Sequence, residues 1–283
     1  MITPFASYPP SDAPEFIKYS HHLIDLALRK ARRPAILCSY GKDSGAVLHL
    51  LSQHVDLSRI DVIYIDSTFE FPAFYKHIAG MKAFFGIRHG GPHDVRCQNN
   101  QAIRSGMSYD NTPVLKLTQT LKTDVLVQVL KERNIDFLFT GIRRDEEGSR
   151  AKERYFSYRE ADGTFDPVSN RPGFYPLDGL DVQSPGSGHY RVNILLGWSE
   201  RDVWEYTEKH LLPVCPLYLA KDGKRYRSLG DEPVTTPVDS DADSIDKIIK
   251  ELYHTSVPER ACRKSQDNSA PYAMEMLRRK GFC

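Results

Sequence analysis

The feature that most constrains the fold is the stretch spanning residues 35–51. A short apolar run at 35–38 leads into a polar turn, Ser39-Tyr40-Gly41-Lys42-Asp43-Ser44, which is followed by apolar residues at helical spacing. The run predicts a buried strand and the spacing predicts a helix. A strand, a glycine turn and a helix in this order present backbone N–H groups and a helix N-terminus to an anion. The stretch therefore predicts an α/β fold with an anion-binding turn.

The residue types in the turn suit a phosphate ligand. Gly41 lets the backbone approach the ligand closely, and Lys42 adds a positive charge. Ser39 and Ser44 add hydroxyl donors, and Ser44 can also cap the helix. The turn is not the common P-loop, because Asp43 rather than Ser or Thr follows the lysine. An ordinary strand–turn–helix with a lysine at its tip is the alternative interpretation.

Two more predicted strands end near this turn. The apolar run at 60–65 ends at Asp66, and the run at 135–140 ends at Gly141. The carboxyl ends of parallel strands line the ligand crevice of an α/β sheet. Asp66 is therefore a candidate contact for magnesium or ribose, and a turn-forming aspartate is an equal alternative.

The segment that follows Gly141 is densely charged and reads IRRDEEGSRAKER over residues 142–154. Taken alone, it predicts a solvated helix with ion pairs four residues apart. Its place at a strand end favours a functional role, since guanidinium groups capture phosphate or sulfate oxygens. The carboxylates would hold magnesium or orient the arginines. The candidates are Arg143, Arg144, Asp145 and Arg150.

The whole pattern predicts a mostly parallel, twisted sheet flanked by helices, with a loop-rich helical C-terminal part. We assign 1–205 to a nucleotide-binding domain and 206–283 to an extension that packs on the site. Further helices are expected at 13–31, 69–85, 117–133, 199–206, 244–255 and 266–280, and a last strand at 191–196. Long polar loops are expected at 160–190 and 221–243.

Composition excludes several classes of protein. The chain has 38 basic and 37 acidic residues, so no electrostatic footprint for nucleic acid stands out, although a local patch stays open. No apolar run is long enough to span a membrane, and the N-terminus lacks a signal-peptide pattern, so we expect a cytoplasmic protein. The five scattered cysteines form no Cys-x-x-Cys pair, which disfavours a zinc or iron–sulfur site. The terminal Cys283 is the thiol whose reactivity is worth testing.

Over nearly its whole length the sequence resembles the small, nucleotide-binding subunits of bacterial ATP sulfurylase. These belong to the PAPS reductase group of pyrophosphate-loop ATP pyrophosphatases, which have an adenine nucleotide alpha-hydrolase-like (HUP) fold. The resemblance rests on the Ser39–Ser44 turn, the charged block at 143–154, residues 198–204, Pro216-Leu217-Tyr218-Leu219, Arg227-Ser228-Leu229-Gly230, and Glu259-Arg260.

The resemblance implies that sulfate attacks the α-phosphorus of MgATP, giving adenosine 5′-phosphosulfate and pyrophosphate. It also implies a GTPase large subunit as partner, and a homo-oligomer is compatible with it. The implied catalytic residues are Lys42, Arg143, Arg144 and Asp145. The implied ATP-binding residues are Ser39, Tyr40, Gly41, Lys42, Asp43, Ser44, Asp66, Gly141 and Arg150. The implied magnesium ligands are Asp43 and Asp145.

Three segments depart from the family pattern. Asp66-Ser67-Thr68 replaces Asp-Thr-Gly, Ile194-Leu195-Leu196-Gly197 replaces Pro-Leu-Ser-Asn, and Gly230-Asp231-Glu232-Pro233 replaces Gly-Cys-Trp-Pro. They leave open a relative that activates another acceptor for sulfur transfer, such as a nucleobase or the DNA backbone. A sulfonucleotide reductase is a further alternative, but it needs a nucleophilic cysteine near its C-terminus, and Cys283 after Gly281-Phe282 is a poor substitute.

Overall fold

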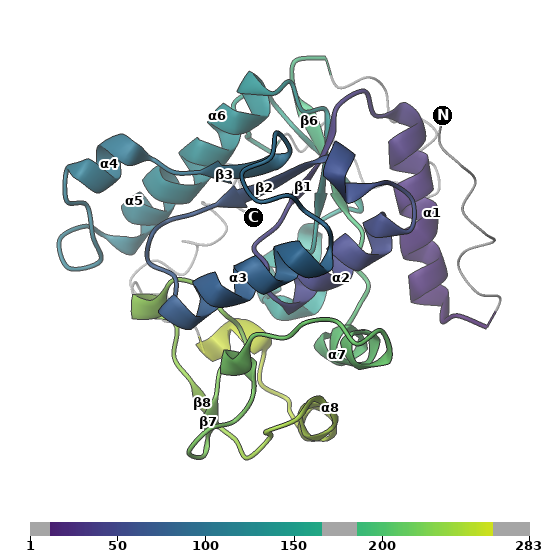
Figure 1. The fold of residues 1–283 in the computed structure, drawn as a ribbon, viewed down its shortest axis with the longest axis vertical. Coiled ribbons are helices and arrows are strands. Elements are labelled where there is room, and N and C mark those ends of the chain that lie inside the picture. Colours follow the sequence, from purple (N-terminus) through teal and green to yellow (C-terminus); the bar gives the residue numbers. More distant parts are fainter. Residues whose placement is uncertain (1–11, 166–185, 263–283) are drawn as a thin grey trace.

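The centre of the computed structural model is a six-stranded sheet with the order β3-β2-β1-β4-β6-β5 (Figure 1). The structure describes residues 12–165 and 186–262. The strands are β1 (Pro34–Leu37), β2 (Asp61–Ile65), β3 (Asp94–Cys97), β4 (Phe137–Thr140), β5 (Phe156–Arg159) and β6 (His189–Asn193). All neighbouring pairs are parallel except β5 and β6, so the predicted mostly parallel sheet is confirmed.

The strand order reverses at β1. The chain passes from β1 to β2 and β3 on one side and then returns to β4 on the other side. In open parallel sheets this switch point leaves a crevice at the carboxyl ends of the two central strands. The fold therefore places the Ser39–Ser44 turn and the residues after β4 beside the same crevice.

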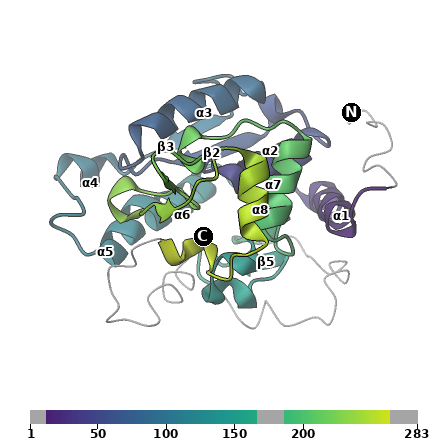
Figure 2. The same cartoon turned by 90° about the horizontal axis from the view of Figure 1, so that it is seen from below.

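Helices cover both faces of the sheet (Figures 1 and 2). They are α1 (Glu15–Lys30), α2 (Lys42–Ser52), α3 (Pro72–Phe84), α4 (Asn100–Arg104), α5 (Val114–Thr118), α6 (Asp124–Glu132), α7 (Glu200–Lys209) and α8 (Ile245–Leu252). Alternate strand residues point to opposite faces. Ile36 and Phe139 join the core formed with α1, α2 and α7, whereas Ala35 and Leu138 pack with α6.

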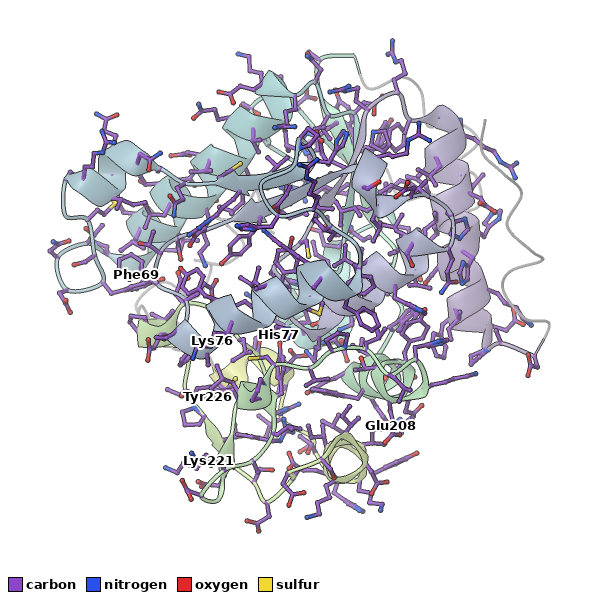
Figure 3. The ribbon with its side chains drawn as sticks, viewed as in Figure 1. Phe69, Lys76, His77, Glu208, Lys221 and Tyr226 are labelled. Atoms are coloured by element: carbon purple, nitrogen blue, oxygen red, sulfur yellow. The ribbon has the colours of Figure 1, made fainter. Side chains whose placement is uncertain are left out.

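The C-terminal part lies beneath the crevice and contributes to the same core. It contains a short hairpin, β7 (Lys224–Arg225) and β8 (Val238–Asp239), and helix α8. Figure 3 shows Lys76 and His77 on the side of α3 that faces this part. There Tyr226 packs against Phe71 with ring centroids 4.9 Å apart. None of the described helices combines the length and the apolarity needed to cross a bilayer.

The structure corrects three predictions of local structure and adds two strands. The segment 221–243 is not one polar loop, since it carries the β7–β8 hairpin. The charged block at 142–154 is not a solvated helix but two 3-10 turns, Arg144–Glu146 and Gly148–Lys152. The predicted helix over 117–133 is interrupted by a π turn at Gln119–Thr123. The edge strands β3 and β5 are not among the predicted elements.

Other predictions of local structure are confirmed. Ser199 caps α7, and Asp202 completes the reciprocal pair of hydrogen bonds at its start. Most of the predicted 160–190 loop, the predicted helix at 266–280 and Cys283 lie outside the described residues.

Candidate active site

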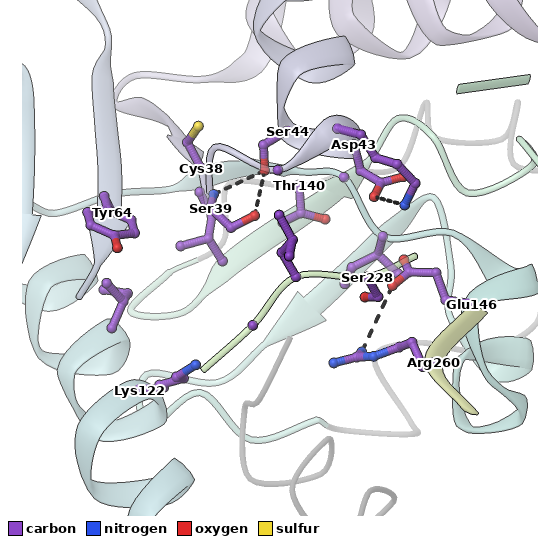
Figure 4. Close-up of a pocket in the computed structure, with 18 of the residues that line it drawn as sticks. Cys38, Ser39, Asp43, Ser44, Tyr64, Lys122, Thr140, Glu146, Ser228 and Arg260 are labelled. Atoms are coloured by element: carbon purple, nitrogen blue, oxygen red, sulfur yellow. Dashed lines mark hydrogen bonds and ion pairs between the residues drawn. The ribbon is translucent and has the colours of Figure 1, made fainter. Parts of the chain in front are cut away.

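A pocket opens at the carboxyl ends of β1 and β4, at the switch point of the sheet. Its walls come from the Ser39–Ser44 turn, from the segment 140–142 and from the end of β2. The C-terminal part supplies the remaining wall through Tyr218, the segment 228–230, Glu259 and Arg260. Figure 4 shows Tyr64 and Lys122 at one end of the pocket, and Asp43, Glu146 and Arg260 at the other.

The turn is held closed by its own serines. The Ser39 N–H donates to Ser44 Oγ at 3.0 Å, and the two hydroxyl oxygens lie 3.0 Å apart. Gly41 precedes the first residue of α2, and a Cβ atom there would lie 3.0 Å from the Tyr218 hydroxyl. Glycine at this position therefore lets Tyr218 approach the N-terminus of α2, where the Lys42 N–H donates to its hydroxyl at 3.3 Å.

Gly141 serves a similar purpose at the end of β4. A Cβ atom on Gly141 would lie 3.3 Å from Asp43, in the first turn of α2. The absence of a side chain lets the segment after β4 lie directly against the Ser39–Ser44 turn. The two strand ends thus form one continuous wall of the pocket.

A cluster of charges forms part of this wall, and Lys42, Arg143 and Glu259 in it are almost fully buried. Lys42 Nζ is 2.5 Å from Glu259 Oε1 and 3.0 Å from Asp43 Oδ2. Arg143 Nε donates to Asp43 Oδ1 at 2.6 Å, and its terminal nitrogens donate to Glu259 and to Asp145 Oδ1. The structure therefore brings together four predicted residues from the turn and the charged block, with a carboxylate from the C-terminal part.

The pKa values in this cluster follow from burial opposed by pairing. Burial alone would raise the pKa of Asp43, but the charges of Arg143 and Lys42 outweigh it and lower that pKa. The pKa of Glu259 is lowered in the same way by Lys42 and Arg143. Burial would lower the pKa of Lys42, but Asp43 and Glu259 raise it. All of these groups are therefore charged at neutral pH.

Asp145 differs from the other carboxylates. Burial raises its pKa, although Arg143 pulls in the opposite direction. Its Oδ2 atom accepts a hydrogen bond of 2.7 Å from the Glu200 N–H at the start of α7. Asp145 therefore links the charged block to α7, and it does not line the pocket.

The two aspartates do not form a ready magnesium site. Both oxygens of Asp43 contact the cations Arg143 and Lys42, and both oxygens of Asp145 also accept hydrogen bonds. Across residues 12–165 and 186–262, no group of three or more His, Cys, Asp or Glu side chains is arranged to hold a metal. The residues present therefore do not fit the assignment of Asp43 and Asp145 to Mg²⁺.

Three predicted residues lie away from the pocket. Arg144 is exposed, and its guanidinium carbon lies 5.1 Å from the centroid of the Tyr155 ring. The Tyr40 ring is buried against Tyr64, so Tyr40 contributes only its backbone to the Ser39–Ser44 turn. Asp66 is fully buried and accepts hydrogen bonds from Thr68, Tyr75, Arg96 and Gln98. None of the three lines the pocket.

Arg150, by contrast, lines the pocket. Its NH1 atom donates to Glu146 Oε1 at 2.6 Å. Arg260 extends from the other side and lies 3.2 Å from Glu147 Oε1. Two arginines and two glutamates thus form an ordered rim at this end of the pocket.

The opposite end of the pocket is largely apolar. Leu37, Ile65 and Leu126 line it, together with Tyr64 and Lys122. Lys122 Nζ lies 2.9 Å from Asp231, which also accepts hydrogen bonds from Ser67 and Tyr109. Apolar walls with a few fixed polar groups are typical of sites for small molecules and cofactors. The pocket thus joins a charged end to an apolar end.

Sequence reasoning missed several residues of this site, namely Glu259, Arg260, Tyr218, Lys122 and Asp231. Glu259-Arg260 and Tyr218 were within segments that carry the family resemblance, which was the available signal. Lys122 enters the pocket through the π turn, and such turns are frequent at functional sites. Hydrophobic spacing alone does not reveal a π turn.

Comparisons with known proteins identify the family of the chain. Residues 33–237 match the Phosphoadenosine phosphosulfate reductase domain family. The chain is 30% identical to Sulfate adenylyltransferase subunit 2 of Myxococcus xanthus (strain DK1622), over 93% of this chain and 94% of that protein. It is 31% identical to the protein of the same name from Geotalea daltonii, over 93% and 95%.

Two solved structures share the fold at low sequence identity. The phosphoadenylyl-sulfate (PAPS) reductase from Candida auris, a phosphate complex, aligns with a TM-score of 0.54 at 16% identity, covering 77% of this chain and 90% of that one. The Candida glabrata FMN adenylyltransferase aligns with a TM-score of 0.50 at 16% identity, covering 82% and 68%. These likenesses confirm the predicted HUP-type architecture.

Proposed function

Since the chain belongs to the sulfate adenylyltransferase subunit 2 family, within the phosphoadenosine phosphosulfate reductase domain family, it is a nucleotidyltransferase, and we propose that it transfers the adenylyl group of ATP to sulfate. A sulfate oxygen attacks the α-phosphorus and forms the new P–O bond. The bond between the α-phosphorus and the bridging oxygen breaks, and its electrons leave with pyrophosphate. No proton transfer is needed, because sulfate reacts as a dianion.

The observation that carries the proposal is the place of the Ser39–Ser44 turn. It lies at the N-terminus of α2, at the switch point of the sheet, between the charged rim and the apolar end of the pocket. We assign the β- and γ-phosphates to the turn and the adenine to the apolar end. Backbone N–H groups at a helix N-terminus stabilise such an anion. Lys42 neutralises the charge that develops on the leaving pyrophosphate.

Magnesium would enter this site with ATP, neutralising charge on its phosphates. The chain's own contribution is to bind, to orient and to neutralise. Arg143 is buried behind the turn and fixes Asp43, so we assign it a positioning role. Arg150 and Arg260 at the rim are the side chains that we assign to the oxygens of the acceptor or of the α-phosphate.

We infer a partner subunit from the relatives' name, since "subunit 2" implies a second chain. The product anhydride is high in energy, so the forward reaction needs a driving force. A GTPase large subunit is the partner that the family resemblance implies.

Among the described residues, the thiol that lines the pocket does not suit a reductase. Cys38 lines the pocket, but burial raises the pKa of its thiol to about 12, so it is not a nucleophilic thiolate at neutral pH. Activation of a different acceptor is the second candidate. The departure at Gly230-Asp231-Glu232-Pro233 favours it, because it begins at Gly230, which lines the pocket.

The test measures both directions of the reaction. The forward assay starts from MgATP with and without sulfate and follows adenosine phosphosulfate together with the orthophosphate that inorganic pyrophosphatase makes from the released pyrophosphate. A parallel reaction adds a GTPase subunit with GTP and follows adenosine phosphosulfate alone. The reverse assay follows ATP made from adenosine phosphosulfate and pyrophosphate. We expect sulfate-dependent turnover, and a loss of about 10²-fold or more in Lys42→Ala. Pyrophosphate release that is indifferent to sulfate would exclude sulfate as the acceptor.

A further inference from the structure

Glu259 holds an unusual position at the charged end of the pocket. Its Oε1 atom is 2.5 Å from Lys42 Nζ, and its Oε2 atom contacts an Arg143 terminal nitrogen. The three side chains are 3%, 1% and 0% exposed, respectively. Glu259 itself comes from Glu259–Cys262, a 3-10 turn far from the other two in sequence. A single carboxylate thus bridges the two buried cations behind the turn.

This bridge occupies part of the ammonium of Lys42, which itself lines the pocket. The Lys42 ammonium already contacts Asp43 and Glu259, and its side chain is almost fully buried. Glu259, in turn, lines the pocket. A phosphate oxygen that replaced the Glu259 carboxylate would therefore contact Nζ. The carboxylate presents two oxygens bonded to one carbon, as a phosphate group presents two oxygens bonded to its phosphorus.

Charge balance favours this exchange. The cations Lys42 and Arg143 contact three carboxylates, those of Asp43, Asp145 and Glu259. The cluster is therefore net negative before any ligand binds. Adding a polyphosphate while Glu259 stays in place would set like charges side by side, which is unfavourable. Removing Glu259 as the phosphate arrives relieves that repulsion.

The segment that carries Glu259 can move more easily than the one that carries Asp43. Asp43 lies in the first turn of α2, within the core. The segment 257–262 is held mainly by polar contacts: Arg227 donates to the Val257 carbonyl at 2.9 Å, Thr236 N–H to the Cys262 carbonyl at 3.1 Å, and Arg260 to Glu147 at 3.2 Å. Val257 is 56% exposed. Displacing this segment leaves the sheet intact.

We propose that Glu259 is an internal anion that occupies the phosphate position beside Lys42 and is displaced when the pyrophosphate end of ATP binds. The proposal rests on the proposed function, since it takes the Ser39–Ser44 turn as the phosphate site. Arg260 is the next residue and also lines the pocket. Departure of Glu259 therefore shifts a rim arginine in the same step, so that phosphate binding reshapes the acceptor end.

Calorimetric titration with inorganic pyrophosphate tests the exchange. Glu259→Gln keeps the shape of the side chain and removes its charge, so we expect it to bind pyrophosphate about tenfold more tightly than the wild type. Glu251→Gln is the matched control, because it removes a carboxylate that pairs with Arg225 at 2.6 Å in the same part of the chain, away from the pocket. It should bind as the wild type does.

Weaker or unchanged binding by Glu259→Gln would overturn the proposal, since it would mean that Glu259 merely positions Lys42 and Arg143. If the wild type and Glu259→Gln were both folded and neither bound pyrophosphate, the phosphate site itself and the proposed function would be overturned.

Hydrogen exchange on the wild-type chain tests the movement without any substitution. Pyrophosphate should slow exchange of the amides of residues 41–45 and speed exchange of those of 259–262. Slower or unchanged exchange at 259–262, with protection at 41–45, would show that Glu259 stays in place, and the proposal would fail even if Glu259→Gln did not fold.

Discussion

At the scale of single residues, Arg143 gives the charged side of the pocket its shape. It is fully buried and contacts Asp43, Asp145 and Glu259. Removing one partner of a buried ionic network leaves the others without compensation, which costs about 3–5 kcal/mol. We expect Arg143→Ala to lower the free energy of unfolding by that amount in urea titrations.

Arg144 provides the control for that measurement. It has the same charge and adjoins Arg143, but it is exposed and packs on the Tyr155 ring. Arg144→Ala should cost about 1 kcal/mol or less and should leave pyrophosphate binding intact. Equal destabilisation by the two substitutions would contradict the assignment of the network to Arg143.

This pair also shows where prediction from sequence ends at this scale. The position of the charged block after a strand indicates that its arginines approach the pocket. Two adjacent arginines look equivalent in the sequence, however. The extended backbone at Arg143, with φ −122° and ψ 147°, turns the two side chains in different directions. That conformation is fixed by contacts with Asp43 and Glu259, which are remote in sequence.

At the scale of elements, buried histidines join α2 to its neighbours. His21 on α1 lies 2.7 Å from His54, which follows α2, and His49 on α2 lies 2.7 Å from the Tyr206 hydroxyl on α7. Burial is the main cause that lowers the pKa of His21 to about 4, and the neighbouring His54 is the second cause. Burial is also the main cause that lowers the pKa of His49 to about 4, and His210 is the second cause.

These pKa values make stability depend on pH below neutrality. In the unfolded chain the two histidines take up protons near pH 6.5, whereas in the folded chain they stay neutral until about pH 4. The unfolded state thus binds more protons between these values, so stability falls as the pH falls. Each histidine contributes up to about 1.4 kcal/mol per pH unit in this window.

Urea titrations at pH 7.0 and pH 5.5 measure this effect. We expect His49→Gln to reduce the loss of stability between the two values. His89→Gln should not, because the His89 side chain is 85% exposed. A His49→Gln variant that loses as much stability as the wild type would rule out this histidine as a source of the pH dependence.

The elements that the sequence reveals are those in the core. The central strands are continuous apolar runs because helices cover both of their faces. The edge strands β3 and β5 read Asp-Val-Arg-Cys and Phe-Ser-Tyr-Arg and are only partly buried. Such short mixed segments carry little periodic signal, and it is their pairing with β2 and β6 that makes them strands.

At the scale of the whole molecule, the C-terminal part completes both the pocket and the core. Tyr218, Ser228 and Glu259 line the pocket together with the Ser39–Ser44 turn. Ile248 on α8 belongs to the same apolar cluster as Ile36 on β1. The division at residues 205 and 206 stays a prediction about sequence organisation, and the shared core implies that the two parts unfold together.

We therefore predict a single unfolding transition for the chain. Its two tryptophans are Trp198 and Trp204, and both are buried at α7, where the two parts meet. Trp204 packs against Tyr218 with ring centroids 5.4 Å apart. Tryptophan fluorescence thus reports on the junction, whereas far-UV circular dichroism reports on the helices of the whole chain. In urea the two signals should change with the same midpoint, as a cooperative unit requires.

The outcome distinguishes a shared core from two stable parts. If the sheet survived on its own, circular dichroism would persist at urea concentrations where the fluorescence change is complete. A chain that ends at residue 205 would then fold as well. We expect it not to fold, because Trp204 would lose Tyr218, and the core around Ile36 would lose the apolar side chains of α8. Each fully buried apolar side chain contributes about 1.5–3 kcal/mol to stability. Losing several of them removes a free energy comparable to that of unfolding a typical domain, which is about 5–15 kcal/mol.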